Sequence, residues 1–260
     1  MKSNRQKILP RRRFDKRVLP NIFTAFNMFL GFTAIILLFK GDPVNAAWLI
    51  LIASGMDVID GKLARLFGIS NRFGTEFDSL ADTVSFCMAP AVLVYTTWAT
   101  GLPPFLAGII SFIPILFGTI RLARFNIISE NNSQSFFTGL TTPLNTLAIF
   151  GFLLFNYQIF GSYGDPRIAI PLMFITSLLM ISPVRFGKFP LLSLHKGRKN
   201  NLRLTGFLIT FLMVIIWRGI VLFPLTTGYI GWSIVVWIIH HNRFEESDAF
   251  SSIQKRGGLS

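Results

Sequence analysis

The chain has 260 residues, of which 52% are hydrophobic and only 14% are charged, and 28 of them are phenylalanine. Ordinary soluble domains carry about 25% charged residues, and a soluble protein of this composition would expose large apolar patches and aggregate. The single cysteine excludes an internal disulfide, and the formal net charge is +13. Composition therefore excludes an ordinary soluble domain and predicts an integral membrane protein.

The first 19 residues form a basic segment directly ahead of a long apolar run. Eight lysines and arginines lie there: Lys2, Arg5, Lys7, Arg11, Arg12, Arg13, Lys16 and Arg17. Because the segment adjoins a membrane span, we expect it to contact anionic lipid headgroups, at about 1 kcal/mol per basic residue. We do not expect nucleic acid as the partner. The following run has full span length, so a cleaved signal peptide is not expected either.

Hydropathy predicts an all-α fold of about eight transmembrane helices, each close to the ~20 residues that cross a bilayer. Glycine and proline clusters separate them. The expected spans are 20–39, 44–61, 79–98, 102–120, 142–161, 167–184, 205–222 and 225–240.

The spans divide the chain into a membrane core and a shorter C-terminal part. Residues 20–184 hold the first six spans, and 185–204 form a basic loop. The last two spans, 205–222 and 225–240, are separated by so few residues that we expect them to form a helical hairpin. A tail at 241–260 follows it. With both termini on the cytoplasmic side, 22 of the 25 lysines and arginines fall in cytoplasmic segments. The positive-inside rule therefore predicts that orientation.

Four aspartates interrupt this apolar pattern at the second and third spans. A carboxylate at the centre of a membrane helix costs roughly 2.5–3.5 kcal/mol, so a cluster of them needs a compensating cation. At 100° per residue, Asp57 and Asp60 share one arc of the second helix, and Asp78 and Asp82 recur every fourth position on the third. Because the two helices are antiparallel neighbours, the carboxylates should face one another. Oxygen ligands on rigid elements suit a pair of divalent cations.

Small residues and one arginine accompany the aspartates in the same register. Gly61, Ala64 and Gly74 leave the helix surface bare, and Arg65 suits bidentate contact with phosphate oxygens. Together with the acids they predict a site for a diphosphate carried on metal ions. Helix packing through small residues alone would explain the glycines but not the carboxylates. A cation transporter or channel would also use intramembrane aspartates, but it would not need Arg65 and the glycines in fixed register.

The spacing Asp57-x2-Asp60-Gly61-x2-Ala64-Arg65-x8-Gly74-x3-Asp78-x3-Asp82 resembles the signature of the CDP-alcohol phosphatidyltransferase family at all eight positions. Residues 18–190 are most similar to the members that use L-serine as the acceptor. That resemblance rests on Leu19-Pro20-Asn21, Phe77-Asp78-Ser79-Leu80-Ala81-Asp82, Arg121-Leu122-Ala123-Arg124-Phe125-Asn126 and Phe137-Thr138-Gly139-Leu140. It departs at Ile181-Ser182-Pro183-Val184-Arg185 and slightly at Leu140-Thr141-Thr142-Pro143.

The resemblance implies a six-helix catalytic core in which an alcohol displaces CMP from CDP-diacylglycerol. The expected product with L-serine is phosphatidylserine; glycerol phosphate and inositol phosphate are the alternative acceptors within the family. It implies that the four aspartates hold two divalent cations, Mg2+ or Mn2+, and that Asp82 is also the general base. It also implies a homodimer in a bacterial inner membrane. The positive-inside orientation places the aspartates on the cytoplasmic side.

The resemblance also implies roles for the small residues and for residues outside the aspartate motif. Gly61, Ala64, Arg65 and Gly74 would hold the CDP-lipid. Arg121 and Arg124 share a helix face and would bind the acceptor carboxylate or a lipid phosphate, with membrane anchoring as the alternative. For Asn27 and Thr24, a cytidine contact competes with a helix-packing hydrogen bond.

Overall fold

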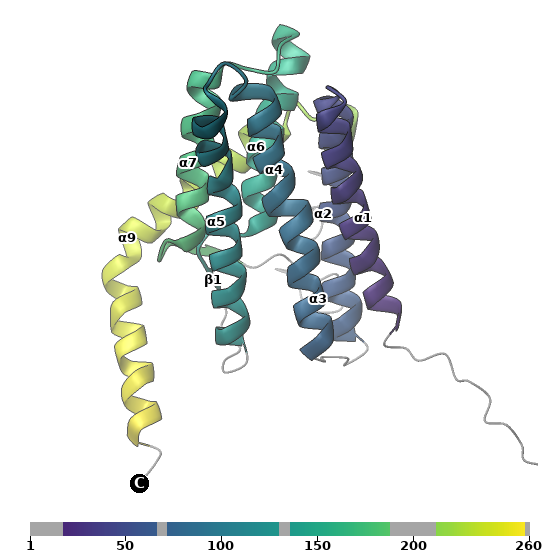
Figure 1. Ribbon diagram of the computed structural model, residues 1–260. Coiled ribbons are helices and arrows are strands. Elements are labelled where there is room, and N and C mark those ends of the chain that lie inside the picture. The colour runs from purple at the N-terminus through teal and green to yellow at the C-terminus, as the bar shows by residue number, and fades with distance from the viewer. Residues whose placement is uncertain (1–17, 67–71, 130–135, 188–211, 258–260) are drawn as a thin grey trace, which may run out of the picture.

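The computed structural model describes residues 18–66, 72–129, 136–187 and 212–257. The elements in chain order are α1 (Val18–Phe39), α2 (Pro43–Leu66), α3 (Arg72–Asp82), η1 (Thr83–Met88), α4 (Ala89–Leu93), η2 (Val94–Trp98), α5 (Pro104–Ser129), β1 (Phe136–Thr138), α6 (Thr142–Phe160), α7 (Pro166–Ile181), β2 (Arg185–Gly187) and α9 (Leu222–Gly257). Most of the helices lie side by side along one common axis (Figure 1).

Six of these helical segments are long and apolar enough to cross a membrane, which confirms the predicted all-α membrane architecture. The helix Pro166–Ile181 is apolar but shorter. Of the predicted seventh span, 205–222, residues 205–211 lie outside the described residues. Residues 212–216 are helical, but 217–221 form a turn, so the span does not continue to residue 222 as predicted. The turn before α9 contains Arg218 and Gly219, both at positive φ.

The structure moves several predicted boundaries. The third span begins at Arg72 instead of residue 79, because the polar residues before Asp78 continue the same helix. The fourth helix continues to Ser129, and α9 continues past residue 240 to Gly257. An antiparallel pairing between β1 and β2, with Phe137 opposite Phe186, is an addition that hydropathy did not predict.

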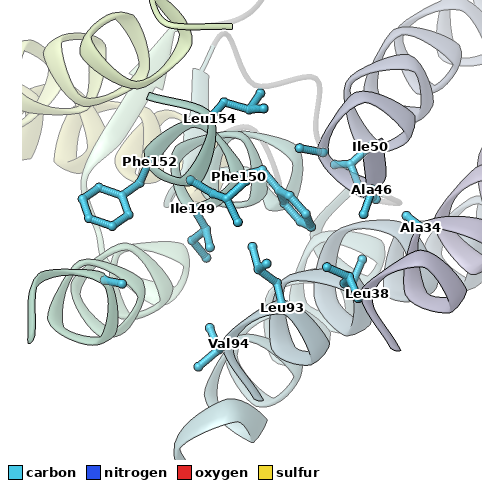
Figure 2. Close-up of a cluster of buried hydrophobic side chains, with 14 of the residues drawn as sticks. Ala34, Leu38, Ala46, Ile50, Leu93, Val94, Ile149, Phe150, Phe152 and Leu154 are labelled. Atoms are coloured by element: carbon cyan, nitrogen blue, oxygen red, sulfur yellow. The ribbon is translucent and has the colours of Figure 1, made fainter. Parts of the chain in front are cut away.

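One end of the bundle collects the start of α1, the start of α3, the end of α5 and the end of α9 (bottom of Figure 1). These are the ends at which the sequence concentrates lysine and arginine. The bundle therefore has one basic end, and the aspartates of α2 and α3 lie toward it. In the upper half of the bundle, buried apolar side chains of α1, α2, α4 and α6 pack together, with Phe150 and Leu93 among them (Figure 2).

The third span is not a regular α-helix above Asp82. A π-helical segment, η1, begins at Thr83, and a second, η2, follows α4. Pro90 has no N–H, so the carbonyl of Phe86 lacks its ordinary i+4 donor. The hydroxyl of Thr146, from α6, donates to that carbonyl at 2.7 Å. A side chain sixty residues away thus satisfies the backbone group that the proline leaves open.

Glycines let the neighbouring helices approach η1 closely. Gly31 of α1 lies against Ser85, whose hydroxyl donates to the carbonyl of Asn27 at 3.0 Å. Gly118 of α5 lies against the Cys87 side chain. The segment that follows Asp82 is therefore in close contact with a glycine on two sides.

We expect Gly31→Ala to destabilise the protein, because the new β-carbon would lie 2.6 Å from the Ser85 α-carbon. Overpacking of this kind costs about 1–3 kcal/mol, and for a chain of this size that lowers the Tm by roughly 2–10 °C. Thermal unfolding of the detergent-solubilised protein measures it. Gly108→Ala is the matched control, since nothing lies within 4 Å of a β-carbon there. An unchanged Tm for Gly31→Ala would show that α1 does not pack on η1 this tightly.

Candidate active site

Carboxylates from α2 and α3 meet near the basic end of the bundle. Asp57 and Asp60 lie one turn apart on α2, and Asp78 lies on the facing helix α3. Each of the three offers a carboxylate oxygen within 4.8 Å of the others. The predicted convergence of these three side chains is therefore confirmed.

Asp82 ends α3, one turn beyond Asp78, and is buried. Its carboxylate is close enough to Asp57 and Asp78 to be repelled by them, and close enough to the Arg121 guanidinium to be attracted. Asp60, Asp78 and Asp82 each keep one buried carboxylate oxygen without a hydrogen-bond partner. Unpaired buried anions this close together fit divalent cations, whose preferred ligands are carboxylate oxygens.

Helix α1 supports this cluster from the side. The hydroxyl of Thr24 donates to Oδ2 of Asp60 at 3.0 Å, so Thr24 orients one of the candidate metal ligands. One turn further along α1, Asn27 is fully buried, and neither atom of its side-chain amide has a hydrogen-bond partner. Its backbone carbonyl, by contrast, accepts from Ser85. Thr24 thus makes the packing hydrogen bond that was one of its two alternatives, and the cytidine contact of Asn27 stays a prediction.

The two arginines of α5 make different contacts. Arg121 is buried, donates to the Thr142 hydroxyl at 3.3 Å, and has its Cζ 5.8 Å from the ring centroid of Phe125. Arg124 donates to the backbone carbonyls of Ile181 and Thr138, each at 3.3 Å. Arg124 therefore ties the end of α7 to β1, whereas Arg121 lies toward the carboxylates.

For the other predicted lipid-binding residues, the structure gives the position on the helix but no contact with a ligand. Gly61 lies directly after Asp60 on α2, and Gly74 lies one turn before Asp78 on α3. Ala64 and Arg65 belong to the last turn of α2, but their side chains fall outside the described part of the chain. The lipid-binding role of these four residues stays a prediction.

Sequence reasoning missed the residues that brace the site from α5 and α6. The Asn126 amide donates to the Ser79 hydroxyl at 3.0 Å, which ties α5 to α3 between Asp78 and Asp82. On α6, Thr142 and Thr146 hold Arg121 and the Phe86 carbonyl. The available signal was the group of polar residues on both sides of Pro143, at the start of the apolar span predicted at 142–161.

Comparison with known proteins agrees with this geometry. The sequence profile of the CDP-alcohol phosphatidyltransferase family matches residues 17–237, so the chain belongs to that family. It is 32% identical over 224 residues to a CDP-diacylglycerol–serine O-phosphatidyltransferase of Helicobacter pylori, covering 85% of this chain and 91% of the relative.

Two archaeal relatives are similar over a shorter stretch. A CDP-diacylglycerol–serine O-phosphatidyltransferase of Methanocaldococcus jannaschii is 36% identical, covering 64% of this chain and 72% of the relative. An archaetidylserine synthase of Methanothermobacter thermautotrophicus is 32% identical, covering 67% and 73% respectively.

We expect Asp78→Asn to remove most of the stabilisation that a divalent cation gives. Binding at about 100 times the Kd stabilises a folded protein by about 2.7 kcal/mol, which corresponds to a Tm rise of roughly 5–10 °C. Without metal, the variant should be at least as stable as the parent, because one of several repelling carboxylates is gone. Thermal unfolding in EDTA and in Mn2+ measures both effects. Glu76→Gln, an exposed acid on the same helix, is the control, and a full Mn2+ response in Asp78→Asn would contradict the assignment.

Proposed function

We propose that this protein transfers the phosphatidyl group of CDP-diacylglycerol to the hydroxyl of L-serine, giving phosphatidylserine and CMP. The observation that carries the proposal is the meeting of Asp57, Asp60 and Asp78 across two membrane helices, within a chain of this family. Serine as the acceptor rests on relatives that are named for that substrate and that align over most of the chain.

Two divalent cations, Mg2+ or Mn2+, are part of the proposal. Asp57, Asp60 and Asp78 would hold them, and Asp82 would complete the second position. Bound there, the cations would neutralise the diphosphate and the charge that develops on the departing CMP. The donor set consists of oxygens only, which fits both ions.

The protein's own residues supply the proton transfer and the positioning. Asp82, buried at the end of α3, would accept the proton of the serine hydroxyl as its oxygen attacks the lipid phosphorus. The bond between that phosphorus and the CMP oxygen breaks as the new phosphorus–oxygen bond forms, in a single displacement without a covalent enzyme intermediate. Arg121 would hold the anionic part of the acceptor beside Asp82. Thr24, through its hydrogen bond, keeps Asp60 in place.

The CDP-lipid would lie over the bare helix surface at Gly61, Ala64 and Gly74, with Arg65 on its phosphates and Asn27 near its cytidine. The basic end of the bundle would face the cytoplasm, since 22 of 25 lysines and arginines are then cytoplasmic. We extend the proposal to a bacterial inner membrane, with anionic lipids contacting the basic N-terminal segment. The homodimer implied by the family resemblance stays a prediction, and the mass of the detergent-solubilised protein tests it.

We expect membranes containing the protein to release CMP from CDP-diacylglycerol when L-serine and Mn2+ are both present. EDTA should abolish the release, and excess Mn2+ or Mg2+ should restore it. Parallel reactions with glycerol phosphate and inositol phosphate, followed by lipid analysis, are the control. A preference for glycerol phosphate or inositol phosphate, or CMP release that does not depend on serine, would overturn serine as the acceptor. The release of CMP from CDP-diacylglycerol would still support the reaction of the family.

We expect Asp82→Asn to lower turnover by about 10²–10⁴-fold, which is the usual contribution of a general base. The amide is almost the same size as the carboxylate, so the Tm without metal should not fall. Initial rates of CMP release at saturating substrates and saturating Mn2+ measure the effect. Glu76→Gln again serves as control, and near-normal turnover in Asp82→Asn would remove this residue as the base.

A further inference from the structure

Four polar residues lie at the N-cap and in the first turns of α6, and the helix is then apolar as far as Phe155. Thr141, Thr142, Asn145 and Thr146 are each at most 6% exposed, and the last three are fully buried. Inside a membrane bundle, a buried polar group without a partner is costly. Each of these side chains therefore needs a partner from the protein or from a ligand.

Two of the four side chains make hydrogen bonds to other helices, and these bonds show which part of the protein this face of α6 contacts. Thr142 accepts from Arg121, which attracts Asp82, and Thr146 donates to the carbonyl of Phe86. Phe86 lies one turn beyond Asp82 on the third span, as Thr146 lies one turn beyond Thr142 on α6. The start of α6 thus runs beside the end of α3 that holds Asp82.

The other two have no partner. Both atoms of the Asn145 side-chain amide and the hydroxyl of Thr141 are buried without a hydrogen bond, and so is Nε of Arg121. Thr141 and Asn145 are four residues apart, so they share a helix face. Thr141 is the N-cap residue of α6, yet its side chain makes no capping hydrogen bond. The positive end of the helix dipole lies at the same place.

We propose that Asn145 is a specificity-determining residue that binds the charged end of the acceptor. Its amide oxygen accepts a hydrogen bond from the acceptor's ammonium group, while Arg121 and Thr141 bind the neighbouring carboxylate. The acceptor class is therefore a hydroxy amino acid, whose hydroxyl points toward Asp82. This inference rests on the proposed function and adds to it a residue outside the aspartate motif.

The test is Asn145→Leu, which replaces the amide with an apolar group of similar size. We expect the KM for L-serine to rise about tenfold to a hundredfold, as for a lost hydrogen bond to a charged group. The KM for CDP-diacylglycerol should change less than about twofold. The Tm should stay unchanged or rise by about 2–4 °C, because an unsatisfied buried group has been removed. A structural role for Asn145 would instead lower the Tm.

Acceptor analogues show which charged group Asn145 binds. 3-Hydroxypropionate lacks the ammonium group, and 2-amino-1,3-propanediol lacks the carboxylate. We expect the parent to prefer L-serine to both, and Asn145→Leu to lose most of its preference over 3-hydroxypropionate while keeping its preference over the diol. Asn145→Ala, which leaves space instead of filling it, should change the preferences in the same direction.

Ser111→Ala is the matched control, a buried polar residue of α5 whose hydroxyl bonds only within its own helix. It lies ten residues, or about 15 Å along the helix, from Arg121. Unchanged serine KM and analogue preferences in Asn145→Leu would overturn the inference, as would a lowered Tm with equal loss of rate for every acceptor. If the parent protein transfers no phosphatidyl group to serine, the proposed function itself is wrong. That outcome is distinct from a parent that uses serine and an Asn145→Leu variant that behaves like it, which would contradict only the inference about Asn145.

Discussion

The mutual repulsion of carboxylates that α2 and α3 bring together is the constraint on which this structure depends. Two unit charges 4.8 Å apart repel by about 3–4 kcal/mol at an effective dielectric constant of 20. Asp57, Asp60 and Asp78 form three such pairs, and Asp82 adds to them. Packing elsewhere in the bundle must hold this arrangement in the absence of metal. The divalent cations of the proposed function would turn the same repulsion into binding free energy, which would explain how a membrane protein can retain four acids in so small a volume.

The packing that holds the acids in place is concentrated around the third span. Its regular helix ends at Asp82, and the π-helical segment that follows is fixed by glycine contacts from α1 and α5 and by Thr146 from α6. π-Helical turns of this kind occur frequently at functional sites. Here the irregular backbone brings three other helices to the residues directly after the proposed base. Arg124, which binds backbone carbonyls, adds a further tie between α7 and β1.

The sequence was sufficient for the parts of the molecule that depend on helical periodicity and hydropathy. Most spans could be predicted because an apolar run near 20 residues long has few alternatives, and the meeting of Asp57, Asp60 and Asp78 followed from the 100° step of two antiparallel helices. The early start of α3 was missed because its first turns are polar, so hydropathy could not separate them from a loop.

Other features depended on contacts between distant parts of the chain. Next to η1, Pro90 removes one backbone donor and the Thr146 hydroxyl replaces it, and this pairing of residues sixty positions apart has no local sequence pattern. The same holds for Thr24 with Asp60, and for the pairing of β1 with β2. The contacts of Arg124 could not be predicted from the sequence either, because its position on α5 is compatible with binding either a ligand or a backbone carbonyl.

The depth of the carboxylates has a consequence for how the protein meets its lipid. Asp60 lies three residues from the end of the span Pro43–Leu63, and Asp82 ten residues into the span Arg72–Trp98. At 1.5 Å per residue, these distances are about 5 and 15 Å. Both depths are less than half the length of their spans, so the carboxylates lie within one leaflet, and a diacyl substrate would reach the proposed metal site by diffusing sideways within that leaflet. The rate would then follow the lipid's mole fraction in the bilayer and not its concentration in the bulk solution.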